Sequence, residues 1–270
     1  MEKALFEGYV ALVTGAGSGI GQAVAQGLGR DGATVICAGR RLGRLEMTCR
    51  ADPLLMRPVA CDIARQSDID ALFQNISATE GRLDFLINAA GIYPQAALAD
   101  CNPEEWRATI DINLTGAAMV MRSALNMMSA RDFGRLVFLG SRSAHHPGAV
   151  TSAYSASKAG LESLTLSAAH ELTWKKTTKT NILVEVLIPG QTITELLPGD
   201  TDTHNKFQRP TEVYPFVRRL LLRPKYAITG GVFYRNRRKR WPDRKLIAKQ
   251  LRLILVDRLP ILRRILFRYG

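Results

Sequence analysis

The stretch that decides the fold is Thr14-Gly15-Ala16-Gly17-Ser18-Gly19-Ile20-Gly21, which lies directly between a strand-like apolar run and a helical pattern. Gly15 permits a tight turn, Gly19 lets the backbone approach a pyrophosphate, and Gly21 allows close packing of helix on strand. The amides at the helix N-terminus then face the anion. The spacing is G-x-x-x-G-x-G, because Ile20 occupies the last glycine of the usual G-x-G-x-x-G. The strand–turn–helix setting favours nucleotide binding over a plain turn.

Outward from this turn, short apolar runs alternate with longer helical patterns. The runs are apolar on both faces, as expected of parallel strands that are covered by helices. The alternation predicts an α/β fold, a doubly wound parallel (Rossmann) sheet of about seven strands, with ligands at the carboxyl ends of the strands. The expected strands are Tyr9–Thr14, Ala33–Ala38, Leu54–Ala60, Leu83–Asn88, Arg135–Gly140, Asn181–Ile188 and Ala227–Tyr234. The expected helices are Ile20–Arg30, Leu42–Arg50, Gln66–Ala78, Pro103–Met128, Ala153–Lys175 and Thr211–Leu222.

Charge divides the chain of 270 residues into two unequal parts. Of the net charge of +13, residues 235–270 carry +11, from thirteen basic and two acidic residues. We therefore expect a nearly neutral dinucleotide-binding catalytic domain over residues 1–234 and a basic amphipathic tail over residues 235–270. Within the domain, Gln191–Pro210 has weak periodicity and follows Pro189-Gly190, so we expect it to cover the substrate as a lid.

The four cysteines show neither paired spacing nor a metal-ligand pattern. They indicate reduced thiols in a reducing compartment, and no metal site is expected. The N-terminus lacks the pattern of a signal peptide, and no apolar stretch reaches the length of a membrane span. These features favour a cytoplasmic protein.

The end of the second expected strand carries Gly39-Arg40-Arg41. Sites for NAD usually place an acidic residue here, to hold the ribose 2′-hydroxyl. A guanidinium instead suits a 2′-phosphate, which an acidic residue would repel. The sequence therefore favours NADP over NAD.

A third motif is Tyr154-Ser155-Ala156-Ser157-Lys158. Tyrosine and lysine at positions i and i+4 of a helix lie on one face, within reach of one site. A nearby ammonium favours the phenolate, so we expect Lys158 to lower the pKa of Tyr154 toward the range useful for acid–base chemistry.

In this order, the motifs resemble the short-chain dehydrogenase/reductase family in its single-domain form, and within it ketoreductases like the 3-oxoacyl-carrier-protein reductases. The glycine turn resembles the family's T-G-x-x-x-G-x-G, and Ser141 stands thirteen residues before Tyr154, the family's usual spacing. The match runs over residues 9–234. Further matches are Asp62 after the third strand, Asn88-Ala89-Ala90-Gly91 after the fourth, Asn113 in a long helix, Pro189-Gly190 after the sixth, and Thr194.

The resemblance implies a catalytic site for hydride transfer. Tyr154 would protonate the developing alkoxide, Lys158 would hold the nicotinamide ribose, and Ser141 would hydrogen-bond the substrate carbonyl. Asn113 would hold a water that connects Lys158 to solvent. The implied cofactor-binding residues are Gly15, Ser18, Gly19, Ile20, Gly21, Arg40, Arg41, Asp62, Ile63, Asn88, Ala89, Gly91, Tyr154, Lys158, Pro189, Gly190, Thr192 and Thr194.

The sequence is compatible with two functions. The first is an NADPH-dependent carbonyl reductase or alcohol dehydrogenase that acts on an apolar ketone or a 3-oxoacyl-type substrate. The alternative is a membrane- or partner-tethered nucleotide-binding scaffold with little turnover, against which the intact set of Ser141, Tyr154 and Lys158 argues. The family resemblance also implies a homodimer or homotetramer.

The tail allows three interpretations. Apolar residues beside many cations suggest a helix on an anionic membrane, which would make the protein peripheral to the inner face of a membrane. The tail also suits docking of an acidic carrier protein that delivers an acyl thioester, or packing on a partner subunit. Nucleic acid is the weakest candidate, because no recognised binding module accompanies the charge.

Overall fold

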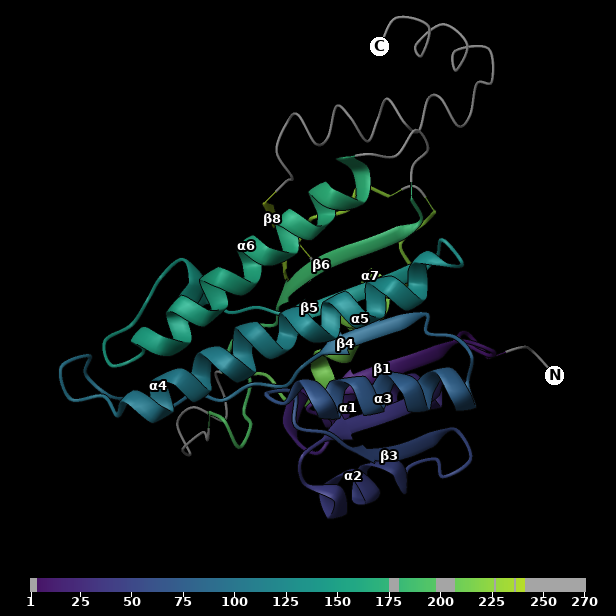
Figure 1. Ribbon diagram of the computed structural model, residues 1–270, viewed down its shortest axis with the longest axis horizontal. Helices are drawn as coiled ribbons and strands as arrows, with labels where there is room; N and C mark the ends of the chain where they lie inside the picture. The colour runs from purple at the N-terminus through teal and green to yellow at the C-terminus, as the bar shows by residue number, and fades with distance from the viewer. Residues whose placement is uncertain (1–3, 175–179, 198–206, 226, 236, 241–270) are drawn as a thin grey trace, which may run out of the picture.

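The computed structural model describes residues 4–174, 180–197, 207–225, 227–235 and 237–240 (Figure 1). Within these ranges the chain forms one sheet with the order β3-β2-β1-β4-β5-β6-β7-β8. The strands β1 to β7 pair in parallel, as predicted, whereas β8 pairs antiparallel with β7. The strands are β1 Val10–Thr14, β2 Thr34–Gly39, β3 Met56–Ala60, β4 Phe85–Asn88, β5 Gly134–Leu139, β6 Ile182–Ile188, β7 Val232–Tyr234 and β8 Arg237–Arg240.

Helices cover both faces of the sheet. Figure 1 shows α3, α5 and α6 on the near face, where they share one apolar core with alternate residues of the strands. The second core joins α1, α2 and α7 to the opposite face of the same strands. The helices are α1 Gly19–Arg30, α2 Leu42–Cys49, α3 Gln66–Thr79, α4 Pro103–Ile110, α5 Ala117–Ser129, α6 Ser152–Trp174 and α7 Tyr214–Leu221, with short turns η2 Arg142–Ala144 and η3 Pro210–Glu212.

The strand order reverses beside β1, because the chain builds β2 and β3 on one side of it and β4 to β7 on the other. In such sheets the crevice for ligands lies where the order reverses, outside the carboxyl ends of the strands. The ends of β1 and β4 meet there, since Thr14 pairs in register with Asn88 and its Oγ1 donates to the Asn88 Oδ1 at 2.7 Å. This bond fixes the two loops that border the crevice.

The expected helix over Pro103–Met128 is interrupted by a π-helical segment, η1 Asp111–Gly116, between α4 and α5. Gly116 lies against the backbone of the loop after β3, where an added Cβ would overlap the Ile63 carbonyl oxygen. The wider π turn carries Asn113, which is fully buried. Single π turns inside α-helices occur frequently at functional sites.

The last part of the sheet differs from the sequence-based expectation. The seventh strand begins at Val232 instead of Ala227, because Gly230 adopts a positive φ of 75° ahead of it. The sheet then continues past residue 234 into β8, with Arg235 at a φ of 52° in the turn. The boundary at residue 234 stays a prediction, and the amphipathic part of the tail, residues 241–270, lies outside the described residues. In the described ranges, no helix combines the length and apolar character needed to cross a bilayer.

Candidate active site

A cavity of about 560 Å³ opens at the carboxyl edge of the sheet. Loops that follow β1, β2, β3, β4, β5 and β6 line it, together with the start of α6. Every cofactor-binding residue expected from the sequence lines this cavity except Asn88, which is buried and bonded to Thr14. Of the expected catalytic residues, Ser141, Tyr154 and Lys158 line the cavity and Asn113 does not.

The glycine turn forms a cradle whose glycines leave no room for side chains against the neighbouring backbone. Gly15 and Gly19 have positive φ values of 67° and 54°, which glycine adopts without steric cost. A Cβ at Gly15 would stand 2.7 Å from the Ala90 amide nitrogen, and one at Gly21 would overlap the Gly15 carbonyl oxygen. The shape of the turn therefore requires glycine, and a glycine turn at a helix N-terminus suits the pyrophosphate of a dinucleotide.

A cluster of charged residues lies at the end of β2. The Arg41 Nη2 donates to the Ser18 Oγ at 3.3 Å and to the Glu195 Oε2 at 3.0 Å. The Arg44 Nη1 stands 3.4 Å from the Glu195 Oε1. Two guanidinium groups and one hydroxyl thus converge beside the glycine turn, where they can hold an anion. In this structure the carboxylate of Glu195 faces them.

The structure brings Ser141, Tyr154 and Lys158 to one part of the cavity. The Lys158 Nζ donates to the Leu139 carbonyl oxygen at 2.8 Å and lies 5.7 Å from the centre of the Tyr154 ring. Burial of the ammonium lowers the pKa of Lys158 to about 8. The pKa of Tyr154 is raised, mainly by burial, with a hydrogen bond to Ser141 opposing the rise. The expected net lowering of the Tyr154 pKa is therefore wrong for this state, because the cost of burying a phenolate outweighs the opposing interactions.

Asn113 does not line the cavity but connects two of the segments that do, through its side-chain hydrogen bonds. Its Oδ1 accepts from the Ile92 amide at 2.9 Å, and its Nδ2 donates to the Ile92 carbonyl oxygen at 2.9 Å. The Nδ2 also donates to the Ser157 Oγ at 3.1 Å. Asn113 thereby joins the loop after β4 to α6 between Tyr154 and Lys158. Its expected role in holding a water stays a prediction.

Tyr93 was not found by sequence reasoning. The Tyr93 ring packs edge-on against the Tyr154 ring, with ring centres 4.6 Å apart. Its position, two residues after Gly91, is the signal that would have placed it at the same strand end. His146 lines the cavity, whereas the His145 Nε2 lies 2.8 Å from the buried Glu162 Oε2.

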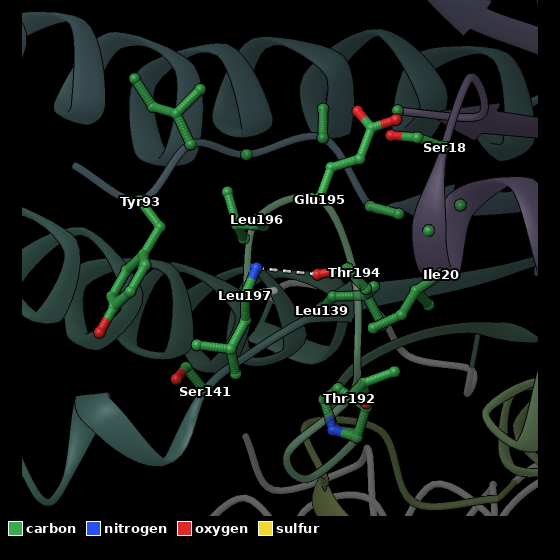
Figure 2. A pocket seen from close by; sticks show the side chains of 18 of the residues that line it. Ser18, Ile20, Tyr93, Leu139, Ser141, Thr192, Thr194, Glu195, Leu196 and Leu197 are labelled. Atoms are coloured by element: carbon green, nitrogen blue, oxygen red, sulfur yellow. Dashed lines mark hydrogen bonds between the residues drawn. The ribbon is translucent and has the colours of Figure 1, made fainter. Parts of the chain in front are cut away.

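The described part of the expected lid, residues 191–197 and 207–210, lies along the cavity. Thr194 and Glu195 line the cavity on the side of the glycine turn, and Figure 2 shows Glu195 turned toward Ser18. Leu197, whose amide donates to the Thr194 Oγ1 at 3.2 Å, lies on the side of Ser141 in the same view (Figure 2). The segment therefore spans both ends of the cavity.

The sheet, the glycine cradle and the lined cavity together define a protein of the dinucleotide-binding α/β class. The family model for short chain dehydrogenase matches residues 9–205. The chain belongs to the short-chain dehydrogenase/reductase family, and it is an NAD(P)-dependent oxidoreductase. Members of this family generally bind small-molecule substrates and often form oligomers.

Individual relatives agree with this assignment. An uncharacterized oxidoreductase of Staphylococcus aureus (strain MRSA252) is 31% identical over 229 residues, which cover 84% of this chain and 96% of the relative. Among solved structures, a putative gluconate dehydrogenase from Agrobacterium tumefaciens has a TM-score of 0.76 at 25% identity, covering 87% of this chain and 98% of that one. A variant of the actinorhodin polyketide ketoreductase, solved with NADPH, has a TM-score of 0.76 at 28% identity, covering 87% and 97%.

Proposed function

We propose that the chain is an NADPH-dependent carbonyl reductase in which Tyr154 donates a proton to the substrate oxygen. The observation that carries the proposal is the convergence of Ser141, Tyr154 and Lys158 in the cavity that also contains the glycine cradle. A hydroxyl, a phenol and an ammonium beside a dinucleotide site suit the reduction of a carbonyl to an alcohol.

Each residue has a defined part in this chemistry. A bound nicotinamide supplies the hydride. The raised pKa of Tyr154 keeps its phenol protonated at neutral pH, as a proton donor requires. Ser141 donates a hydrogen bond to the carbonyl oxygen, where negative charge develops. Lys158, with its pKa lowered to about 8, is still mostly charged at neutral pH and stabilises the phenolate that Tyr154 leaves behind.

The preference for NADPH rests on the charged cluster after β2. Arg41 and Ser18 present donors to the cavity, and Gly39-Arg40-Arg41 contributes no acidic residue there. Guanidinium groups bind phosphates through charge-assisted hydrogen bonds, so a 2′-phosphate fits this end of the site. The structurally similar ketoreductase solved with NADPH supports the same preference.

An apolar ketone or a 3-oxoacyl-type compound is the proposed substrate. Ile92, Tyr93, Leu196 and Leu197 contribute apolar surface to the cavity that holds Ser141 and Tyr154. Similarity to a polyketide ketoreductase supports this choice of substrate class. We further propose that the protein is a cytoplasmic homodimer or homotetramer. Its tail would bind an anionic membrane surface or an acidic carrier protein.

Replacing Tyr154 with phenylalanine tests the reaction. Oxidation of NADPH is measured with a panel of ketones, with NADH in parallel, and cofactor binding is measured by fluorescence. Tyr154→Phe should abolish turnover and leave cofactor affinity near that of the wild type, because the ring is kept and only the proton donor is lost. Tyr93→Phe is the matched control, since it removes a neighbouring hydroxyl from a ring packed on Tyr154.

Turnover retained by Tyr154→Phe would refute the role of Tyr154. Loss of turnover in Tyr93→Phe to the same extent would show that the effect is not particular to the Tyr154 hydroxyl. Binding of NADPH by the wild type without its oxidation by any ketone would favour the nucleotide-binding scaffold instead.

A further inference from the structure

The carboxylate of Glu195 faces the guanidinium groups on which the proposed preference for NADPH depends. Its two oxygens face two different guanidinium groups, Arg41 at 3.0 Å and Arg44 at 3.4 Å. Arg41 also donates to the Ser18 hydroxyl at 3.3 Å, so one guanidinium joins the glycine turn to Glu195. Ser18, Arg41 and Glu195 all line the cavity. The site therefore contains an anion supplied by the chain itself.

This carboxylate comes from a distant part of the sequence. Glu195 follows β6 and lies 154 residues after Arg41, which follows β2. The neighbouring Thr194 packs on the glycine turn, since a Cβ at Gly19 would stand 3.0 Å from the Thr194 methyl group. Figure 2 shows the Glu195 side chain turned toward Ser18. The acidic residue that the end of β2 lacks is thus supplied from the segment that follows β6.

We propose that Glu195 is a specificity-determining residue that competes with the 2′-phosphate of NADPH for Arg41 and Arg44. This inference rests on the proposed NADPH site. A 2′-phosphate needs the same guanidinium donors that Glu195 uses, and its charge repels the carboxylate. A 2′-hydroxyl has no such conflict, because it can donate a hydrogen bond to a carboxylate that stays in place. Glu195 therefore reduces the advantage of NADPH over NADH.

The expected effect is modest because both ion pairs are exposed, with 57% of the Arg41 side chain and 48% of the Glu195 side chain accessible. Exposed pairs change an equilibrium constant by roughly 1.4- to 5-fold each. Removing the carboxylate frees both guanidiniums and ends its repulsion of the phosphate. We expect the preference for a 2′-phosphate to rise by about three- to tenfold in Glu195→Gln.

The test uses two small probes that differ only in the 2′-phosphate. Adenosine 2′,5′-bisphosphate and adenosine 5′-monophosphate are titrated by calorimetry into the full-length wild type and Glu195→Gln, and NADPH and NADH are compared in the same way. The measured quantity is the ratio of the two dissociation constants. Glu104→Gln is the matched control, because it removes one negative charge from an exposed pair with Arg107 on α4, outside the residues that line the cavity.

A rise in the ratio for Glu195→Gln, with no change in Glu104→Gln, supports the proposal. An unchanged or lower ratio in Glu195→Gln overturns it, and so does an equal rise in both variants, which would reflect net charge alone. Wild type that binds none of the four nucleotides refutes the proposed function and this inference with it. Because binding is measured directly, a raised ratio of dissociation constants in Glu195→Gln, without turnover of any ketone by the wild type, would refute only the proposed reaction.

Discussion

Replacing Lys158 with methionine should stabilise the folded protein near neutral pH while removing its turnover. The Lys158 side chain is only 6% exposed, and its ammonium makes one hydrogen bond, to the Leu139 carbonyl oxygen. Burial therefore costs more than this bond returns, and the pKa falls from 10.5 to about 8. Methionine has a similar length and no charge to desolvate.

The size and sign of the effect follow from the two pKa values of Lys158. A fall from 10.5 to about 8 corresponds to a cost of about 3 kcal/mol for folding with a charged lysine. The unfolded state binds more protons between these pH values, so this cost is fully present below pH 8 and is relieved as the pH rises toward 10.5. Loss of the hydrogen bond in the variant costs about 1 kcal/mol, which leaves a net gain of about 2 kcal/mol at pH 7.

Urea unfolding, followed by circular dichroism at pH 7 and pH 10, measures this gain as the difference in unfolding free energy between Lys158→Met and the wild type. The difference should favour the variant at pH 7 and shrink by about 2 kcal/mol at pH 10. Arg50→Met, which also removes one positive charge but at an exposed position, is the control and should change stability little at either pH. A variant less stable than wild type at pH 7, or a difference that does not depend on pH, would show that burial of the ammonium carries no such penalty.

Two further predictions concern the glycine turn and the tail. Gly21→Ala should weaken dinucleotide binding at least tenfold in a fluorescence titration, because its Cβ would overlap the Gly15 carbonyl oxygen. Gly43→Ala is the control, since an added Cβ there meets nothing within 4 Å. Equal affinities for the two variants would contradict the role of the glycine cradle in binding. Deleting residues 241–270 should release the protein from anionic liposomes in a sedimentation assay and leave NADPH affinity unchanged, because the cationic apolar segment lies there. Equal sedimentation of both proteins would end the membrane hypothesis.

The strands could be predicted because their apolar runs are continuous, and the errors lie where local hydrogen bonds override that pattern. The third strand begins at Met56 and not at Leu54, because the Asp52 carboxylate accepts from the amides of Leu54 and Leu55 and holds them in a turn. Leu54 is 96% exposed, although it reads as an apolar strand residue. Asp52-Pro53, directly before this run, is the sequence signal for the turn, and the apolar pattern alone does not reveal it.

In the site, too, local motifs could be predicted from the sequence, whereas contacts between distant positions could not. The glycine turn and the Tyr154–Lys158 pair are set by spacing within one element, so the sequence places them in the cavity. The partnership of Glu195 with Arg41 joins positions 154 residues apart, and no periodicity relates them. Nor could the i, i+4 spacing reveal that the Lys158 Nζ donates to the Leu139 carbonyl oxygen at the end of β5, which depends on how α6 packs on the sheet.

Burial of the site acts on both members of the proposed proton-donating pair, and in opposite senses. It raises the pKa of Tyr154 and lowers the pKa of Lys158, because a low-dielectric surrounding disfavours whichever form is charged. At neutral pH the phenol is therefore protonated while the lysine keeps most of its charge. In the proposed reaction, the neighbouring ammonium of Lys158 stabilises the phenolate that remains after Tyr154 has donated its proton. That support declines above pH 8, because Lys158 then loses its positive charge.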